Sequence, residues 1–247
     1  MTKFAHDDIK PFAGETGKKE QVAGMFDSLA PRYDLVNRVL SVGIDRGWRK
    51  KAIRELQKDA PQHILDVATG TADMALLTAR LLQPAKITGI DISEGMLEVG
   101  RQKIARTNLK TTIELVSGDS ETINFGNHSF DAVMVAFGVR NFENLETGLA
   151  EMLRVLKPGG KLVVLEFSQP VFPGVRHLYQ FYMGAVAPQV AKWFRQNKKA
   201  YEYLNCSAKA FPDRQRFVNI LEKVGYTDTL FKPLSLGICC IYVGRKK

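Results

Sequence analysis

From Ile64 onward, short apolar runs alternate with helical patterns, and this alternation limits the fold more than any other feature of the sequence. The runs read HILDVA, MALLTARLL, KITGIDI, EGMLEVGRQKIA, TIELVSGD, FDAVMVAFG, LETGLAEMLRVL and KLVVLEF. Strands that alternate with helices of this length predict βαβ units and a parallel sheet. The strands are apolar on both faces, as a sheet covered by helices requires. We therefore expect an α/β fold with a doubly wound, mostly parallel sheet.

Two segments depart from this alternation. Before the sheet, KEQVAGMFDSLAPRYDLVNRVLSVGIDRGWRKKAIREL predicts two or three helices, separated at Pro31 and Gly43. After it, residues 168–212 hold aromatic-rich helical sequence where one connecting helix would suffice, and such excess length is usually functional. A last helix and an antiparallel hairpin follow. We expect a single domain, 1–247, with a helical cap (1–60), a cofactor-binding core (61–168), an aromatic and basic lid (169–212) and the last helix with its hairpin (213–247).

The stretch ILDVATGTADMALLTAR predicts a buried strand, a tight turn and a helix, which is the layout of a nucleotide-binding loop. It holds a single glycine, Gly70, with Ala68 and Ala72 at the neighbouring small positions. A dinucleotide-binding loop needs G-x-G-x-x-G, and a P-loop needs a following GKS or GKT. NAD and nucleoside triphosphates are therefore disfavoured, and a cofactor without phosphate is favoured.

Three acidic residues end three successive predicted strands: Asp66, Asp91 and Asp119. Ligands of open α/β sheets bind outside these carboxyl ends. Asp91, 21 residues after Gly70, is placed to accept hydrogen bonds from two ribose hydroxyls, and Asp119 lies within reach of an adenine amino group. Each acid alone could be a helix cap or turn residue. Their shared position favours S-adenosylmethionine, with Asp66, Gly70, Asp91 and Asp119 in its site.

The positive charge is concentrated in the C-terminal third. Of the net charge of +9, residues 169–247 account for 13 Lys and Arg against 4 Asp and Glu. A localised excess suits anionic lipid or nucleic acid, although a solvated basic face remains an alternative. The three cysteines form no CxxC pair, so we expect reduced thiols packed as small apolar side chains. With no signal-like N-terminus and no run of about 18 apolar residues, we expect neither export nor a membrane span.

Four motifs resemble one family. RVLKPGGKLVVLEFS (154–168) and YDLVNRVLSVGIDRGW (33–48) are similar to the two signatures of the menaquinone/ubiquinone C-methyltransferases of the UbiE/MenG type. FGVRN (137–141) matches the F-G-x-R-N segment of this family, and YEYLNCSAKAFP resembles its Y-x-x-L-x-x-S-x-x-x-F-P stretch. The resemblance implies a Rossmann-like class I methyltransferase with a seven-stranded sheet. It covers nearly the whole chain from about Lys19.

The resemblance also implies a reaction and a cofactor site. Its members methylate a ring carbon of a polyprenylated quinol in respiratory quinone biosynthesis, with S-adenosylmethionine as donor and no metal. Thr71, Asp91, Asp119 and Ser120 match the cofactor contacts of the family, whereas Ala136 replaces a Ser or Thr contact. The G-T-A-D variant at Ala72 favours demethylmenaquinol as substrate. 2-Polyprenyl-6-methoxy-1,4-benzoquinol, of the ubiquinone pathway, is the alternative.

Three residues are candidates for catalysis: Arg140, Asn141 and Tyr33. A quinol carbon becomes nucleophilic when the neighbouring hydroxyl loses its proton, so the site must stabilise a phenolate. We expect Arg140 to stabilise the quinolate or to position a water, with Asn141 assisting and Tyr33 lining the ring pocket. Alternatively, Arg140 forms a structural ion pair with an acid, and Tyr33 is a core tyrosine.

The composition of the lid suits a channel for the prenyl tail of the substrate, next to a membrane. Lys192, Arg195 and Lys199 share one helical face, which suits an anionic leaflet. We therefore expect a cytoplasmic protein at the inner face of the cell membrane, although the aromatic residues could simply pack the lid onto the core. The resemblance also implies that a homodimer could form. The aromatic and apolar residues of the lid are Phe172, Tyr179, Phe181, Tyr182, Met183, Trp193 and Phe194.

Two rival functions are weighed against this one. A nucleic-acid methyltransferase would suit the basic third, but the N/D-P-P-Y/F motif, a Pro-Cys nucleophile and a recognition domain are absent from the sequence. We therefore expect no nucleic acid partner. A non-catalytic subunit that only binds S-adenosylmethionine would have no use for both Asp91 and Arg140.

Overall fold

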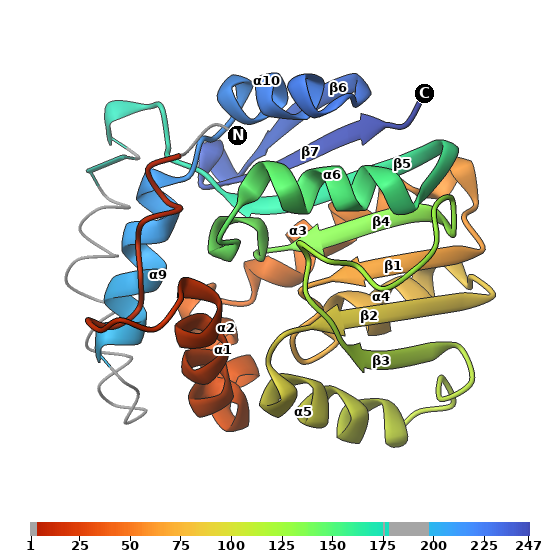
Figure 1. Cartoon of the computed structure of the whole chain (residues 1–247), viewed down its shortest axis with the longest axis horizontal. Coiled ribbons are helices and arrows are strands. Elements are labelled where there is room, and N and C mark those ends of the chain that lie inside the picture. The colour runs from red at the N-terminus through yellow and green to blue at the C-terminus, as the bar shows by residue number, and fades with distance from the viewer. Residues whose placement is uncertain (1–3, 175, 178–197) are drawn as a thin grey trace.

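The computed structural model describes residues 4–174, 176–177 and 198–247. They form a seven-stranded sheet in the order β3-β2-β1-β4-β5-β7-β6, whose first five strands run parallel. β7 pairs antiparallel with both β5 and β6 (Figure 1). The predicted doubly wound sheet and the C-terminal antiparallel hairpin are thus confirmed. The strands are β1 His63–Val67, β2 Lys86–Asp91, β3 Ile113–Ser117, β4 Phe130–Ala136, β5 Leu156–Phe167, β6 Thr227–Leu234 and β7 Cys239–Arg245.

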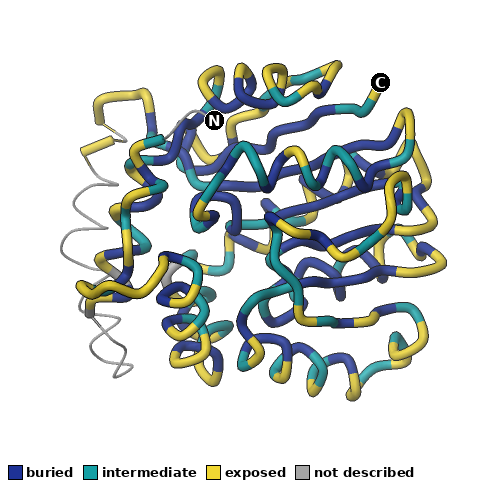
Figure 2. Tube along the Cα trace, in the orientation of Figure 1, coloured by how far each residue is buried: buried dark blue, intermediate teal, exposed yellow. Residues whose placement is uncertain are grey.

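Helices cover both faces of the sheet, and α6 lies in front of it in Figure 1. In β5, Leu162 and Val164 pack with α6 and α10, whereas Val163 and Leu165 pack with α3, α4 and α5. This alternation follows from the two-residue period of a strand, and the central strands β1, β2, β4 and β5 are mostly buried (Figure 2). The helices are α1 Lys18–Leu29, α2 Tyr33–Leu40, α3 Ile44–Arg54, α4 Asp73–Leu82, α5 Glu94–Ala105, α6 Leu145–Val155, α9 Lys198–Ala210 and α10 Gln215–Val224.

The N-terminal helices divide where the sequence predicts. A short 3-10 turn, Ala30–Arg32, contains Pro31 and separates α1 from α2. Gly43, with φ of +74°, precedes α3 in the left-handed conformation that glycine adopts without strain. α3 packs on the sheet face through Trp48 and Ile53 rather than joining α1 and α2 beside the pocket described below.

α1 and α9 form a separate apolar cluster at the carboxyl edge of the sheet. Met25 and Leu29 of α1 pack there against Ala200 and Tyr203 of α9. α9 is the part of the expected lid that the structure describes best, and its Lys199 is exposed. Phe172 is also exposed. The other lid residues of interest lie outside the described residues: Tyr179, Phe181, Tyr182, Met183, Lys192, Trp193, Phe194 and Arg195.

The cysteines differ in their surroundings. Cys239 and Cys240 are buried in β7, whereas Cys206 is exposed on α9. The expectation of packed thiols is therefore wrong for Cys206, because the polar side of α9 faces solvent at that position. Among the helices of the described ranges, none is both long enough and apolar enough to span a bilayer.

Candidate active site

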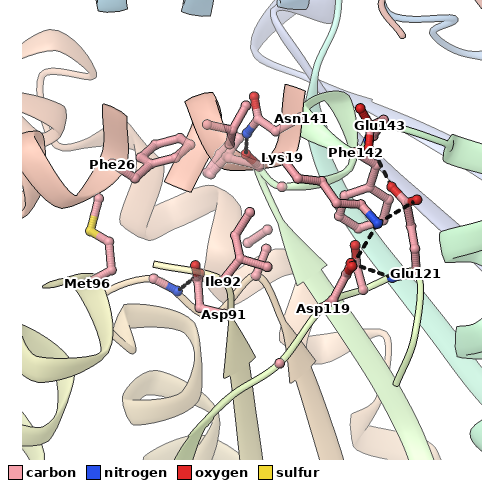
Figure 3. A pocket seen from close by; sticks show the side chains of 18 of the residues that line it. Lys19, Phe26, Asp91, Ile92, Met96, Asp119, Glu121, Asn141, Phe142 and Glu143 are labelled. Atoms are coloured by element: carbon pink, nitrogen blue, oxygen red, sulfur yellow. Dashed lines mark hydrogen bonds and ion pairs between the residues drawn. The ribbon is translucent and has the colours of Figure 1, made fainter. Parts of the chain in front are cut away.

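A pocket lies at the carboxyl ends of β1, β2 and β4, and it encloses about 660 Å³, including the part open to solvent. Helices α1 and α2 form its other wall. Figure 3 shows Phe26 and Met96 on one side, and Lys19 near Asp119 and Glu121 on the other. The lining residues are Lys19, Val22, Phe26, Tyr33, Ala68, Gly70, Asp91, Ile92, Met96, Gly118, Asp119, Ser120, Glu121, Ala136, Phe137, Gly138, Asn141, Phe142 and Glu143.

The loop between β1 and α4 is tight, as the sequence predicts. Ala68, Gly70 and Ala72 all have positive φ, at +53°, +55° and +64°. The left-handed conformation costs an alanine roughly 1–2 kcal/mol, so the surrounding structure must hold this loop in place. Backbone hydrogen bonds from Thr69 to the carbonyl of Ile90 (3.0 Å) and from Gly70 to the Asp91 Oδ2 (2.8 Å) fasten it to β2.

Asp91 ends β2 and lines the pocket. Its carboxylate accepts hydrogen bonds from the backbone N–H of Gly70 and of Ser93, the latter at 2.9 Å. Burial raises the pKa of Asp91 to about 6, although these N–H groups favour the charged form. These two hydrogen bonds hold the carboxylate in place at the pocket wall.

Asp119 and Ser120 also line the pocket, but Asp119 has a partner that the sequence does not indicate. Lys19 of α1 donates a 2.7 Å hydrogen bond to its Oδ2 and lies 2.9 Å from the Glu121 Oε2. The Oδ1 of Asp119 accepts from the backbone N–H of Glu121 at 2.8 Å. Lys19 and Glu121 thus belong to the site. The only hint of Glu121 in the sequence is its place two residues after Asp119.

Asp66 does not line the pocket. It is buried in β1 and accepts a 2.7 Å hydrogen bond from the hydroxyl of Thr69. Burial raises its pKa to about 7. Its Oδ1 is buried without a hydrogen-bond partner among the described residues. Such an acceptor is costly unless a ligand or a water satisfies it.

Thr71 also points away from the pocket. Its hydroxyl donates to the Asp34 Oδ1 at 2.5 Å, and the Lys103 Nζ lies 3.2 Å from the same hydroxyl. Lys103 donates to the Asp34 Oδ2 at 2.7 Å and also contacts Asp73. This network, here called the Asp34 clamp (Asp34, Thr71, Asp73 and Lys103), joins α2 to the cofactor loop and to α5.

Arg140 lies behind the pocket wall. Its Nη1 donates to the Glu166 Oε1 and to the carbonyl of Phe137, both at 2.6 Å, and its guanidinium stacks 5.3 Å from the centre of the Phe167 ring. Arg140 is 4% exposed and Glu166 is fully buried. The ion pair with an acid, which the sequence leaves open, is therefore present. Arg140 fixes the turn that presents Phe137 and Asn141.

Tyr33 and Asn141 line the pocket directly, from α2 and from the turn after β4. The Oδ1 of Asn141 accepts a 3.2 Å hydrogen bond from the hydroxyl of Tyr203, and its Nδ2 donates a long, 3.5 Å hydrogen bond to the carbonyl of Phe137, so one amide N–H remains for a ligand. Burial raises the pKa of Tyr33, against the opposing effects of Asn37 and of the nearby guanidinium groups. Tyr33 is therefore a neutral phenol with a proton to donate.

Comparison with known proteins decides the family. The model of the ubiE/COQ5 methyltransferase family matches residues 15–246. The chain belongs to this family. A demethylmenaquinone methyltransferase from Bacteroides fragilis is 44% identical over 98% of this chain and 99% of its own length. A ubiquinone/menaquinone biosynthesis C-methyltransferase UbiE from Geotalea daltonii is 45% identical over 94% of this chain and 98% of its own length.

The fold of this ubiE/COQ5 methyltransferase is shared with class I methyltransferases of solved structure. Phosphoethanolamine N-methyltransferase 2 from Haemonchus contortus, in complex with S-adenosyl-L-methionine, superposes with a TM-score of 0.54 at 13% identity. The match covers 75% of this chain and 48% of that one. At this identity it concerns the fold alone.

The residues of this ubiE/COQ5 methyltransferase fit S-adenosylmethionine. The pocket offers carboxylates at Asp91 and Asp119 for hydroxyl and amino groups, and backbone at Gly70 and Gly118 for close approach. Within the described ranges, no group of three or more His, Cys, Asp or Glu is arranged to hold a metal ion.

Proposed function

We propose that the protein transfers a methyl group from S-adenosylmethionine to a ring carbon of demethylmenaquinol, giving menaquinol. The observation that carries this proposal is one pocket whose lining combines two kinds of group. Asp91 and Asp119 suit a nucleoside, and Tyr33, Phe137 and Asn141 suit an aromatic ring with hydroxyl groups. The names of the relatives from Bacteroides fragilis and Geotalea daltonii support the substrate class.

The cofactor side would hold S-adenosylmethionine by hydrogen bonds to its ribose, adenine and amino acid tail. Asp91 would accept from the ribose hydroxyls, while Asp119 and Ser120 would contact the adenine. Asp66 does not line the pocket and would act indirectly, by holding the loop through its hydrogen bond with Thr69. Thr71 would act through the Asp34 clamp. When bound, the cofactor supplies an electrophilic methyl group on its sulfonium.

The acceptor side would stabilise the quinolate and align its ring. Tyr33 and Asn141 are proposed to donate hydrogen bonds to the quinolate oxygen, since both are donors that face the pocket. Arg140 would act as a positioning residue whose buried positive charge, shared with Glu166, also favours a nearby anion. Phe26 and Phe137 exclude water from the ring. An ordered water would remove the ring proton after transfer.

The finer features of the function are also proposals. The ring could instead be 2-polyprenyl-6-methoxy-1,4-benzoquinol, because Phe26 and Phe137 offer an apolar wall to either ring. We propose a cytoplasmic enzyme that rests on the inner face of the membrane, with the basic C-terminal third toward anionic lipid, and that forms a homodimer.

The test is methyl transfer from labelled S-adenosylmethionine to the two reduced quinones in parallel, in the presence of liposomes. Product from either quinol supports the proposal and identifies the ring. Tyr33→Phe and Asn141→Ala should each lower kcat by about 10²-fold while the Kd for S-adenosylmethionine stays unchanged. Cofactor binding without product from either quinol would refute the proposal and favour the non-catalytic subunit.

A further inference from the structure

Large apolar side chains are exposed together at the corner between α2 and α3. Leu35, Val39, Val42 and Ile44 are 54%, 40%, 77% and 50% exposed. They make up four of the nine exposed large hydrophobic residues in the described ranges, and they fall within ten positions of each other. We refer to these four residues as the α2–α3 patch. Apolar residues scattered singly on a surface need no explanation, but a cluster indicates an interaction.

α2 has one wide apolar side, and part of that side is exposed. Val36 packs inward and is 1% exposed, whereas Leu35 and Val39, one turn apart, are exposed beside it. An amphipathic surface helix normally buries its apolar side, so the exposed part of this side is expected to have a second apolar environment. The next residue of the patch, Val42, has φ of +51°. A β-branched residue in this conformation is strained, and such strain concentrates at functional sites.

The surroundings of the patch are basic. α3 begins at Ile44 and presents Arg46, Lys50 and Lys51 to solvent. Its single acidic residue, Asp45, is turned inward, where it accepts a 2.7 Å hydrogen bond from the hydroxyl of Ser41. The exposed side of this corner therefore combines apolar side chains with positive charge. That combination is typical of segments that lie in the interface of an anionic bilayer.

The patch also lies on the helix that borders the pocket. Tyr33, at the start of α2, lines the pocket wall, and Leu35 and Val39 follow on the outer side of the same short helix. A polyprenylated substrate has its tail in the bilayer, so an enzyme that takes it up must bring the pocket close to the lipid. The need for this closeness rests on the proposed function.

We propose that the α2–α3 patch is the membrane-docking face of the protein, with Val42 and Ile44 inserted among the acyl chains of an anionic leaflet. Arg46, Lys50 and Lys51 contact the lipid headgroups. Docking by this corner holds α2 at the lipid surface and the pocket directly beside it. The four apolar residues, rather than the basic lid alone, are therefore the source of membrane affinity.

The test compares two variants with the same change of charge. V42D/I44D alters the patch, and L81D/L230D alters two exposed leucines on α4 and β6, which are 45% and 39% exposed. The full chain is sedimented with vesicles of phosphatidylglycerol and phosphatidylcholine, and with phosphatidylcholine alone. V42D/I44D should bind the anionic vesicles about tenfold more weakly than the wild type, while L81D/L230D should bind as the wild type does. Wild-type binding should fall on neutral vesicles.

Turnover separates this proposal from the proposed function. V42D/I44D should keep wild-type kcat/KM on a short-tailed, water-dispersed demethylmenaquinol and lose turnover of a long-tailed one held in vesicles. Equal vesicle binding by both variants and the wild type would refute the docking face. A fall in oligomer size of V42D/I44D by analytical ultracentrifugation, with unchanged vesicle binding, would instead identify the patch as an interface between copies. Failure of methyl transfer on both substrates by the wild type would refute the proposed function and leave the sedimentation result intact.

Discussion

Gly138→Ala should disrupt the turn that carries the candidate catalytic residues. A Cβ added at Gly138 would lie 2.6 Å from the Cβ of Ala68 and 3.1 Å from the Val135 Cγ1. Ordinary carbon contacts are about 3.5–4.0 Å, so one wall must move by about 1 Å. The Cβ of Ala68 is fixed to the backbone and cannot rotate away. Overpacking of this kind destabilises by about 2–3 kcal/mol, or about 5–10 °C in Tm for a chain of this size.

The double mutant provides the critical measurement. A68G/G138A removes the colliding methyl group and also relieves the left-handed alanine at position 68. We expect it to regain at least half of the lost stability, with a coupling energy above about 1 kcal/mol by calorimetry or urea unfolding.

G138A alone should lower kcat/KM by about 10²-fold, because the turn moves by about 1 Å. Gly47→Ala, an exposed helical position with no atom within 4 Å of the added Cβ, should not destabilise and serves as control. A wild-type Tm for G138A, or no recovery in the double mutant, would refute the reasoning.

Three further predictions concern charged residues. Arg140→Leu leaves Glu166 buried without its counter-charge and should lower the free energy of unfolding by about 3–5 kcal/mol. R140L/E166L should recover most of this stability. An equal loss of stability in the single and the double mutant would contradict the prediction. Because the pKa of Asp91 is raised to about 6, titration calorimetry should give a Kd for S-adenosylmethionine that is about tenfold higher at pH 5 than at pH 8. The Asp91→Asn variant should bind the cofactor weakly at both pH values. The same shift means that Asp91 favours the folded apoprotein below its ordinary pKa of 3.8, and that this contribution is lost as the pH rises through about 6. Asp34→Asn breaks the contact with Lys103 and should lower kcat/KM about tenfold with faster amide exchange in α2; unchanged exchange would argue against the Asp34 clamp.

The sheet and the cofactor side of the pocket follow from local sequence. Apolar runs predict the strands, and the residue after or near the end of a parallel strand must lie at one edge of the sheet. Asp91 and Asp119 lie at this edge and line the pocket, and Pro31 and Gly43 separate the N-terminal helices, as their spacing predicts.

The direction of individual side chains could not be predicted, because it depends on elements that are distant in the sequence. Thr71 turns to Asp34 because α2 packs over the loop, and Arg140 turns to Glu166 because β4 and β5 are neighbours. Lys19 approaches Asp119 only because α1 folds across the edge of the sheet. Each contact joins residues that are 26 to 100 positions apart.

The buried pair of Arg140 and Glu166 has a consequence for how this site can change over evolution. Replacing either residue alone leaves the other as an unpaired charge in an apolar interior. Evolution by single substitutions would therefore pass through a poorly folded single mutant. Substitutions at the two positions should therefore occur together or not at all. The turn after β4 is therefore expected to be retained. A change in acceptor preference would have to come from substitutions at residues that line the pocket, such as Phe26, because they leave no buried charge without a partner.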